Sequence, residues 1–255
     1  MTSNRVVRGS ILLIIVMVVA GCASRGAAER PPDPDPFEPV NRAIFKFNDF
    51  GDKYVLRPLA VGYEWVTPQV IRTGIRNFFD NLGTPVDFVN AFLQGKVRQG
   101  FSGIGRMALN TTVGLAGFLD PATDIGMEKY DEDFGQTLGV WSVPEGPYIV
   151  VPFFGPRTIR SGAGNLVDIQ YAPQFNHLFS SSVQTKINIF WFIELRSTIL
   201  SFDEEINRAF DKYSFIRDSY LQNRRFLMYD GNLPDDDLFL EEEFEDFDDD
   251  FEEDF

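Results

Sequence analysis

Apolar residues recur at helical spacing from residue 41 onward, and turn residues mark where helices begin. Residues 41–54 carry isoleucine and phenylalanine on one side of a predicted helix. The Thr-Pro pair at residues 67–68 is typical of an N-cap and a first helical residue, and it opens a predicted helix that reaches residue 82. A second Thr-Pro pair at residues 84–85 and an Asp-Pro pair at residues 120–121 predict two further helix starts.

The middle of the chain differs from its carboxy-terminal part in glycine and proline content. Residues 83–164 contain many of both, which predicts short helices joined by tight corners, and only residues 148–154 resemble a strand. Residues 182–200, 203–211 and 214–229 contain neither glycine nor proline and predict a helical series. We therefore expect one mainly α domain, and we find no internal repeat.

Several short segments are apolar on most of their faces. The segment at residues 187–193 contains a single polar residue inside a predicted helix, and residues 88–93, 112–119 and 148–154 are similarly apolar. A helix that is apolar all round lies either at the centre of a core or against lipid. A body of about 200 residues has limited interior for so many such segments. Composition leaves both alternatives open.

The amino terminus has the arrangement of basic, apolar and small residues that is typical of a bacterial secretion signal. Arg5 and Arg8 precede an apolar run over residues 11–20, which is about half the length of a membrane-spanning helix. The run ends in Val-Val-Ala-Gly immediately before Cys22, which resembles a lipobox. We therefore expect residues 1–21 to be removed and the Cys22 thiol to carry a lipid anchor. Ordinary secretion with a free or buried Cys22 is the alternative.

These signals divide the chain into four parts. A lipoprotein signal peptide at residues 1–21 precedes an acylated, flexible tether at residues 22–34, which is charged and rich in proline. The helical body is expected over residues 35–230, and an acidic, phenylalanine-containing tail over residues 231–255. Ala23 follows the cysteine where aspartate is associated with retention in the inner membrane, so resemblance to bacterial lipoproteins favours the outer membrane.

The net charge of −15 is concentrated at the carboxy terminus. Residues 235–255 hold 14 of the 38 acidic residues and no basic one, so the rest of the chain is close to neutral. A nucleic-acid-binding surface would need a basic patch that this sequence lacks. Blocks of like charge favour a solvated tail. Leu240 and four phenylalanines at spacings of three or four would instead share one face of a helix that folds on a basic, apolar partner.

Catalytic and metal chemistry has little support in the sequence. The chain has one cysteine and one histidine, Cys22 and His177, which cannot form a zinc site by themselves. We find neither a G-x-S-x-G nucleophile motif nor a phosphate-binding G-x-x-x-x-G-K-[ST] loop. Gly103 and Gly105 loosely match a dinucleotide-binding motif, but close helix packing explains them better. We predict no cofactor, no metal and no enzymatic activity, and a phospholipase that uses His177 is the least favoured alternative.

Seven short motifs follow one another through the body. They begin with DPFEPVNRAIFKFND at residue 35 and continue through NAFLQGK, NTTVGLAGFLD, FGQTLG, GPY, PFFGP and DKYSFIRDSYLQ, which ends at residue 222. In content and order they resemble the MlaA (VacJ) family of outer-membrane lipoproteins, and the match covers the whole body. Lys212, where proline is usual, and Arg157, where a small or polar residue is common, depart from the family pattern and are interpreted as peripheral.

The resemblance implies a ring of short and medium helices, embedded in the periplasmic leaflet of the outer membrane, around a central amphipathic channel. It also implies a protein that associates with porin trimers, removes mislocalised phospholipids from the outer leaflet and passes them to a soluble periplasmic carrier. Such retrograde transport would preserve the lipid asymmetry of the outer membrane. A structural lipoprotein that only braces porin trimers is the alternative.

The first motif supplies the candidate residues of a channel gate. Asn41, Arg42, Asn48 and Asp49 place polar groups on the first predicted helix, and Phe45 lies among them. One interpretation is that this segment borders the channel and gates it. The other is that the same residues cap the helix and form buried hydrogen bonds. The sequence does not separate the two.

Three residues elsewhere are further candidates. Gly114 and Gly117 either act as a hinge near the channel or allow close helix packing. Lys186 lies just before the apolar segment at residues 187–193, where its ammonium group could reach a phospholipid headgroup, although a solvated lysine is equally compatible. His177 is interpreted as structural.

Overall fold

The computed structural model describes residues 34–171 and 181–233. The chain divides into two units, Met1–Pro34 and Asp35–Phe255, and every described residue except Pro34 belongs to the second unit.

Several predictions fall outside the described residues. They concern the anchor at Cys22 with its signal peptide and tether, the role of His177, and the two alternatives for the acidic tail. All of them remain predictions.

Four helical segments form the first part of the body. They are α2 (Glu38–Gly51), the π-helix η1 (Asp52–Leu56), α3 (Arg57–Val66) and α4 (Gln69–Leu93). The proline in the first turn of α2 suits a helix start, because a first-turn N–H has no intrahelical partner to lose. Helix α3 follows η1 without a break in helical conformation. The helix predicted at residues 41–54 is confirmed, although its last residues are π-helical.

Helix α4 corrects two predicted helix starts. Thr67 ends α3, and Pro68 is the N-cap of α4, so the helix begins one residue later than predicted. The second Thr-Pro pair starts no helix, because Pro85 lies buried inside α4, which continues to Leu93. An internal proline removes one backbone hydrogen bond, and the packing of α4 along the next helix compensates for that loss.

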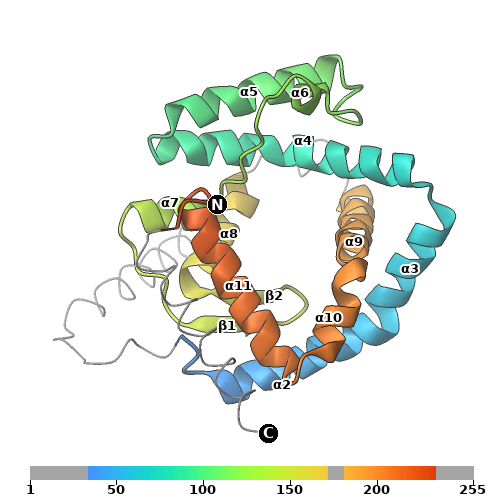
Figure 1. Cartoon of the computed structure of the whole chain (residues 1–255), viewed down its shortest axis with the longest axis vertical. Coiled ribbons are helices and arrows are strands. Elements are labelled where there is room, and N and C mark those ends of the chain that lie inside the picture. The colour runs from blue at the N-terminus through green and yellow to red at the C-terminus, as the bar shows by residue number, and fades with distance from the viewer. Residues whose placement is uncertain (1–33, 172–180, 234–255) are drawn as a thin grey trace, which may run out of the picture. The chain divides into compact units, whose positions relative to one another are not determined.

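Helix α5 (Val97–Thr112) folds back along α4, and the two lie side by side in Figure 1. Glycines make this contact close. A Cβ atom on Gly103 would lie 3.0 Å from the Cβ atom of Phe88, and one on Gly100 would lie 2.6 Å from the ring of Phe92. The packing explanation of Gly103 is therefore confirmed. The prediction of short helices is wrong here, because these glycines do not interrupt α5. They instead allow α4 to pack closely against it.

Two short helices and a β-hairpin follow. They are α6 (Pro121–Asp124), α7 (Phe134–Val140), β1 (Tyr148–Val151) and β2 (Gly155–Thr158). Asp120 caps α6 as predicted, since its side chain accepts a hydrogen bond from the Thr123 N–H. Strand β1 confirms the first half of the strand predicted at residues 148–154. Strand β2 pairs with β1 in antiparallel fashion, with Tyr148 opposite Thr158. Strand β2 was not predicted from the sequence, because it begins with Gly-Pro, which is unusual in strands.

The carboxy-terminal part is helical, as predicted. Its elements are α8 (Ile159–Tyr171), α9 (Ser181–Thr198), the 3-10 helix η3 (Leu200–Phe202), α10 (Asp203–Arg208) and α11 (Lys212–Met228). Asp211 is the N-cap of α11, and its side chain accepts a hydrogen bond from the Tyr213 N–H.

The elements of this unit follow one another round a ring in Figure 1. Helices α2 and α3 form one arc, α4 continues from α3 across the side of the ring that faces away from α2, and α7, the β-hairpin and α11 form the arc opposite α3. Helix α9 packs against α3, α10 contacts α11, and α2 contacts β1, so the circuit closes. The predicted mainly α, ring-shaped body is confirmed.

The interior of this body is polar. Among the described residues, seven hydrophobic side chains are buried against fifteen polar or charged ones, while 39 large hydrophobic side chains are exposed. One apolar cluster centres on Tyr148, Val150 and Tyr213. Across the described ranges, no helix has both the length and the apolar character needed to cross a membrane.

Candidate functional site

Asn41 joins α2 to the β-hairpin. Its side chain is buried, and Nδ2 donates hydrogen bonds to Asp35 Oδ1 at 2.7 Å and to the Tyr148 carbonyl oxygen at 3.1 Å. Its Oδ1 atom accepts a hydrogen bond of 2.9 Å from the Val150 N–H. One amide side chain therefore satisfies two backbone groups of β1 that would otherwise be buried without partners.

Asn48 repeats this contact two helical turns later. Its Nδ2 atom donates to the Val151 carbonyl oxygen at 3.0 Å, and its Oδ1 atom accepts from the Phe153 N–H at 2.8 Å. A separation of seven residues returns to the same face of a helix. The two asparagines thus attach α2 to the edge of the hairpin. Their side-chain amides make the hydrogen bonds that the backbone of a neighbouring strand would otherwise make.

Arg42 binds α2 to the start of α11. Its Nη1 and Nη2 atoms donate to the two carboxylate oxygens of Asp211 at 3.1 and 2.5 Å, and its Nε atom donates to Glu38 at 2.6 Å. The guanidinium also lies 4.3 Å from the ring centre of Tyr213. Hydrogen bonds from Arg42 and Ser214 hold the pKa of Asp211 well below its usual value.

The two departures from the family pattern differ in their surroundings. Lys212 forms an ion pair with Asp49, and so links α11 to α2. The two side chains are about one third exposed, and the interpretation of Lys212 as peripheral remains a prediction. The contact itself could not be read from the sequence, because the two residues are 163 positions apart. The Arg157 guanidinium donates to the carbonyl oxygen of the preceding Pro156 at 2.7 Å, which is a local contact.

Phe45 faces the apolar cluster between the same elements. Its ring packs edge-on against Tyr213, with 5.5 Å between the ring centres. The Tyr213 hydroxyl donates a hydrogen bond to Asp35, which lies buried just before α2. Burial and the Asp35 carboxylate raise the pKa of Tyr213 above its usual value. The aromatic and polar contacts therefore meet at one place.

We call this region the polar joint, defined as residues 35–49, 148–158 and 211–220. It brings together all five gate candidates of the first motif. Each of the four polar ones has a hydrogen-bonding or ionic partner within the joint. This is the arrangement that the buried-hydrogen-bond interpretation describes. A gating role for these residues remains a prediction.

Gly114 and Gly117 lie elsewhere, in the turn after α5. A Cβ atom on Gly114 would lie 2.4 Å from the carbonyl oxygen atoms of Asn110 and Leu119. Gly117 has φ +92°, and a Cβ atom there would lie 2.5 Å from the Cβ atom of Asn81 on α4. Gly114 is needed for close approach, and Gly117 for both close approach and backbone conformation. A hinge at this turn remains a prediction.

Lys186 lies in the second turn of α9 and is exposed to solvent. It belongs neither to the polar joint nor to the glycine turn. Its contact with a headgroup therefore remains a prediction, and the structure places the sequence-predicted candidates in three separate regions.

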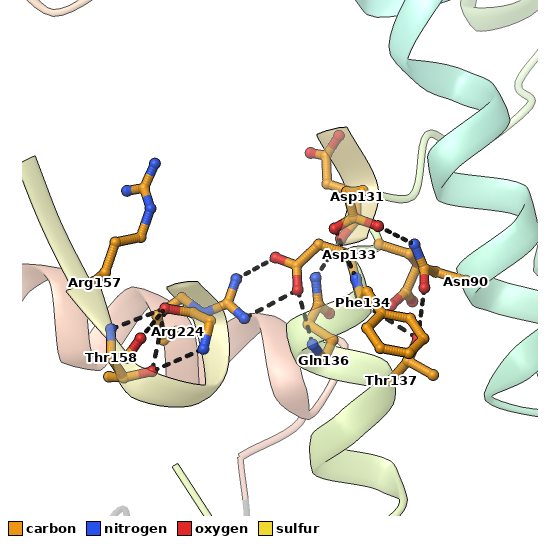
Figure 2. A network of polar contacts seen from close by, with 12 residues as sticks. Asn90, Asp131, Asp133, Phe134, Gln136, Thr137, Arg157, Thr158 and Arg224 are labelled. Carbon is orange, nitrogen blue, oxygen red and sulfur yellow. Dashed lines mark hydrogen bonds and ion pairs between the residues drawn. The ribbon is translucent and has the colours of Figure 1, made fainter. Parts of the chain in front are cut away.

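A second polar network crosses the body where α4, α7, α8 and α11 meet. In Figure 2 the Arg224 guanidinium points at the Asp133 carboxylate, which also caps α7 by accepting the Gln136 N–H at 2.8 Å. Burial alone would raise the pKa of Asp133, but the hydrogen bonds from Arg224 and from Gln136 lower it below its usual value. Thr137 donates to Asn90 Oδ1 at 2.8 Å and extends the network to α4.

Asp87 on α4 carries a carboxyl group with an unusual pKa. The group is half-buried, and burial together with the Asp131 carboxylate raises its pKa to about 8, against the opposing effect of Lys129. At neutral pH this side chain is therefore mostly protonated.

Exposed apolar side chains gather where α3 turns into α4. Trp65, Val66 and Val70 are 85%, 66% and 76% exposed. They are close in sequence on either side of the turn, and we call these three residues the apolar corner. Water-facing side chains of this size and number carry a large hydration cost.

Sequence reasoning missed the charged residues beside this corner. Arg72 forms an ion pair with Glu64, and Arg76 pairs with Glu194 at 3.3 Å. The spacing of the two arginines in an otherwise apolar predicted helix was the available signal, because residues four apart lie on one helical face.

Comparison with known proteins gives one consistent result. Residues 33–227 match the MlaA lipoprotein family. The chain is 35% identical to the intermembrane phospholipid transport system lipoprotein MlaA of Shigella flexneri and to that of Escherichia coli strain K12, over 89% of this chain and 90% of each relative. The protein of the same description from Haemophilus influenzae is 32% identical over 87% of this chain and 90% of its own length.

A solved structure has the same fold. It is described as a structural basis for maintenance of bacterial outer membrane lipid asymmetry, and it aligns with a TM-score of 0.69 at 34% sequence identity. The alignment covers 77% of this chain and 100% of that one.

Proposed function

Because this chain belongs to the MlaA lipoprotein family, we propose that it removes mislocalised phospholipids from the outer leaflet of the outer membrane. It passes them through the ring to a soluble periplasmic carrier, and so maintains the lipid asymmetry of that membrane. The relatives described as phospholipid transport lipoproteins support this function over nearly the whole chain.

The observation that carries the proposal is the polarity of the body. Among the described residues, buried side chains are mostly polar, whereas many large hydrophobic side chains are exposed. A protein surrounded by water is stabilised by the opposite arrangement. The body therefore sits in the periplasmic leaflet, with its exposed apolar side chains against acyl chains and its buried polar side chains bonded to one another within the ring.

The anchor and the partners complete the proposal. Acyl chains on Cys22 hold the protein in the outer membrane, because two or more chains give stable attachment. A porin trimer supports the ring in the membrane, and the carrier receives lipid on the periplasmic side. Replacement of Cys22 by alanine should leave the protein without its acyl mass, since the chain has no second thiol.

The test is the amount of phospholipid on the cell surface. A deletion strain should expose more phospholipid to a membrane-impermeant, amine-reactive reagent than its parent, and the wild-type chain should restore the parental amount. Unchanged surface phospholipid together with altered porin assembly would contradict transport and favour a structural brace.

A further inference from the structure

A cleft of about 410 Å³ lies where α3, α4, α9 and η3 meet. In Figure 1 this is the place where α3 turns into α4 and α9 runs beside them. Its volume falls within the range of small-ligand sites. Charged residues that line it include Glu64, Arg72 and Arg76, and Thr73, Ser197 and Ser201 add hydroxyl groups.

The charges of this cleft are balanced. Arg72 pairs with Glu64 across the turn from α3 to α4, and Arg76 pairs at 3.3 Å with Glu194, whose side chain is almost fully buried. The side chains of Arg76 and Glu64 remain 46% and 38% exposed. Both signs of charge are therefore accessible to a ligand that enters the cleft.

The hydrogen-bonding capacity of the cleft is not used up. The Nε atom of Arg72 is buried and has no hydrogen-bond partner within the described parts of the chain. A buried donor without an acceptor is unfavourable, so a ligand oxygen would relieve it. Helix α4 also begins beside the cleft with Pro68 as N-cap and no side-chain cap, so its positive end favours a negative group.

The apolar corner is adjacent in the sequence to residues that line the cleft. Glu64 directly precedes Trp65, and Gln69, which also lines the cleft, directly precedes Val70. A molecule bound here would have charged groups in the cleft and apolar groups along the exposed Trp65, Val66 and Val70. Such a molecule is amphipathic, which favours a lipid over a free phosphate compound.

We propose that this cleft binds the headgroup of a zwitterionic aminophospholipid, with the phosphate at Arg72 and Arg76 and the ammonium group at Glu64. A zwitterion supplies both charges: its phosphate can replace Glu64 at Arg72 while its ammonium group binds the freed Glu64 carboxylate. Arg76 keeps its ion pair with the buried Glu194 and binds the phosphate with the exposed part of its guanidinium. A lipid with an anionic headgroup would satisfy the arginines and leave Glu64 unpaired, which costs affinity. This inference rests on the proposed transport function and adds a preferred headgroup to it.

The experiment measures lipid bound to the full-length protein. The purified protein is equilibrated with mixed micelles of mild detergent that contain equal amounts of phosphatidylethanolamine and phosphatidylglycerol, and the bound lipids are quantified. Wild-type protein should be enriched in phosphatidylethanolamine. The double variant Arg72→Gln/Arg76→Gln should bind roughly tenfold less of that lipid, because charge-assisted hydrogen bonds to the phosphate are lost.

Two further variants separate recognition from folding. Glu64→Gln keeps the shape of the side chain and should bring the two lipids to about equal occupancy, because only the ammonium partner is removed. Arg208→Gln, on exposed α10, removes an ion pair outside the cleft and should leave the lipid ratio unchanged. Circular dichroism of each variant checks that the helices are intact.

The outcomes distinguish the two proposals. Equal binding of the two lipids by wild-type protein, or an unchanged ratio in both cleft variants, overturns the headgroup site and leaves phospholipid transport intact. Displacement of bound lipid by inorganic phosphate as readily as by glycerophosphoethanolamine would show a simple phosphate site and overturns the lipid assignment. Wild-type protein that retains no phospholipid at all contradicts the transport function itself.

Discussion

The polar joint and the apolar corner lie in different parts of the ring and use their side chains in opposite ways. In the joint, the side chains of Asn41, Arg42 and Asn48 form hydrogen bonds with the backbone and side chains of neighbouring elements. At the corner, Trp65 and Val70 contact little of the chain, and in the cleft lined by the neighbouring residues the Nε atom of Arg72 is a buried donor without an acceptor. The joint also contains one buried polar atom without a hydrogen-bond partner among the described residues, the Tyr148 hydroxyl, but it exposes far less apolar surface at its centre than the corner does.

This difference separates stability from binding in the same body. The apolar core is small, so directional hydrogen bonds and ion pairs hold the arcs of the ring together. The hydrophobic side chains that a soluble protein would bury remain available to the membrane. Substitutions in the joint should therefore reduce stability, and substitutions at the corner should reduce lipid contact while stability is kept.

The largest expected effect is that of Asn41→Ala. The substitution leaves the Val150 N–H and the Tyr148 carbonyl oxygen without their side-chain partner in a buried place, and it removes one of the hydrogen bonds that Asp35 accepts. We expect the free energy of unfolding to fall by about 3 kcal/mol, as unsatisfied buried polar groups cost ~1–3 kcal/mol each and water partly compensates.

Chemical unfolding in detergent, followed by circular dichroism, measures this loss. Asn188→Ala, at an exposed position of α9, is the matched control and should change stability little. Similar losses in both variants would mean that the joint does not hold the ring.

Asp87 tests the polar interior through pH. Its folded-state pKa of about 8 lies above the ordinary unfolded value of about 3.9. The unfolded state therefore releases this proton first, and stability falls as pH rises from about 4 to about 8. Asp87→Asn removes that contribution. The difference in melting temperature between the variant and wild type should therefore be more in favour of the variant at pH 9 than at pH 5.

The exposed carboxylate of Asp124 provides the control for this measurement. Asp124→Asn should follow the wild-type melting curve at both pH values. Parallel pH profiles for wild type and Asp87→Asn would show that the carboxyl group is not shielded from water.

The smallest effect is expected for Lys212→Pro, which restores the residue usual in the family. The change removes the ion pair with Asp49, worth about 0.2–1 kcal/mol at a partly exposed site. Proline at the first position of α11 should stabilise the folded state by a similar free energy, because it restricts the unfolded chain and loses no helical hydrogen bond. Lys212→Met, which loses only the ion pair, should be the less stable of the two in thermal unfolding.

Local signals were enough to predict most of the helices. The 3.6-residue periodicity located α2, the Asp-Pro pair located the start of α6, and the absence of glycine and proline located α9 to α11. Pro85 led to a wrong prediction. Its local preference for a helix start is outweighed by the packing of α4 against α5. Strand β2 was missed because Gly155-Pro156 resembles a turn, and only its pairing with β1 makes it extended.

The candidate site shows a sharper limit. The sequence identified Asn41, Arg42 and Asn48 as important polar residues of the first helix. It could not identify their partners, because Tyr148 lies 107 residues from Asn41, and Asp211 lies 169 from Arg42. The cleft was invisible for the same reason, since α3, α4 and α9 meet there only in the folded chain.

The most direct test of the account is the environment of Trp65 in a membrane. A variant with Trp141→Phe and Trp191→Phe keeps Trp65 as its only tryptophan, since the chain has three. It is reconstituted into vesicles whose lipids carry bromine on their acyl chains. If the apolar corner contacts acyl chains, brominated lipid should quench Trp65 fluorescence strongly and aqueous iodide should quench it weakly. Strong quenching by iodide with none by brominated lipid would place the corner in water and contradict the account.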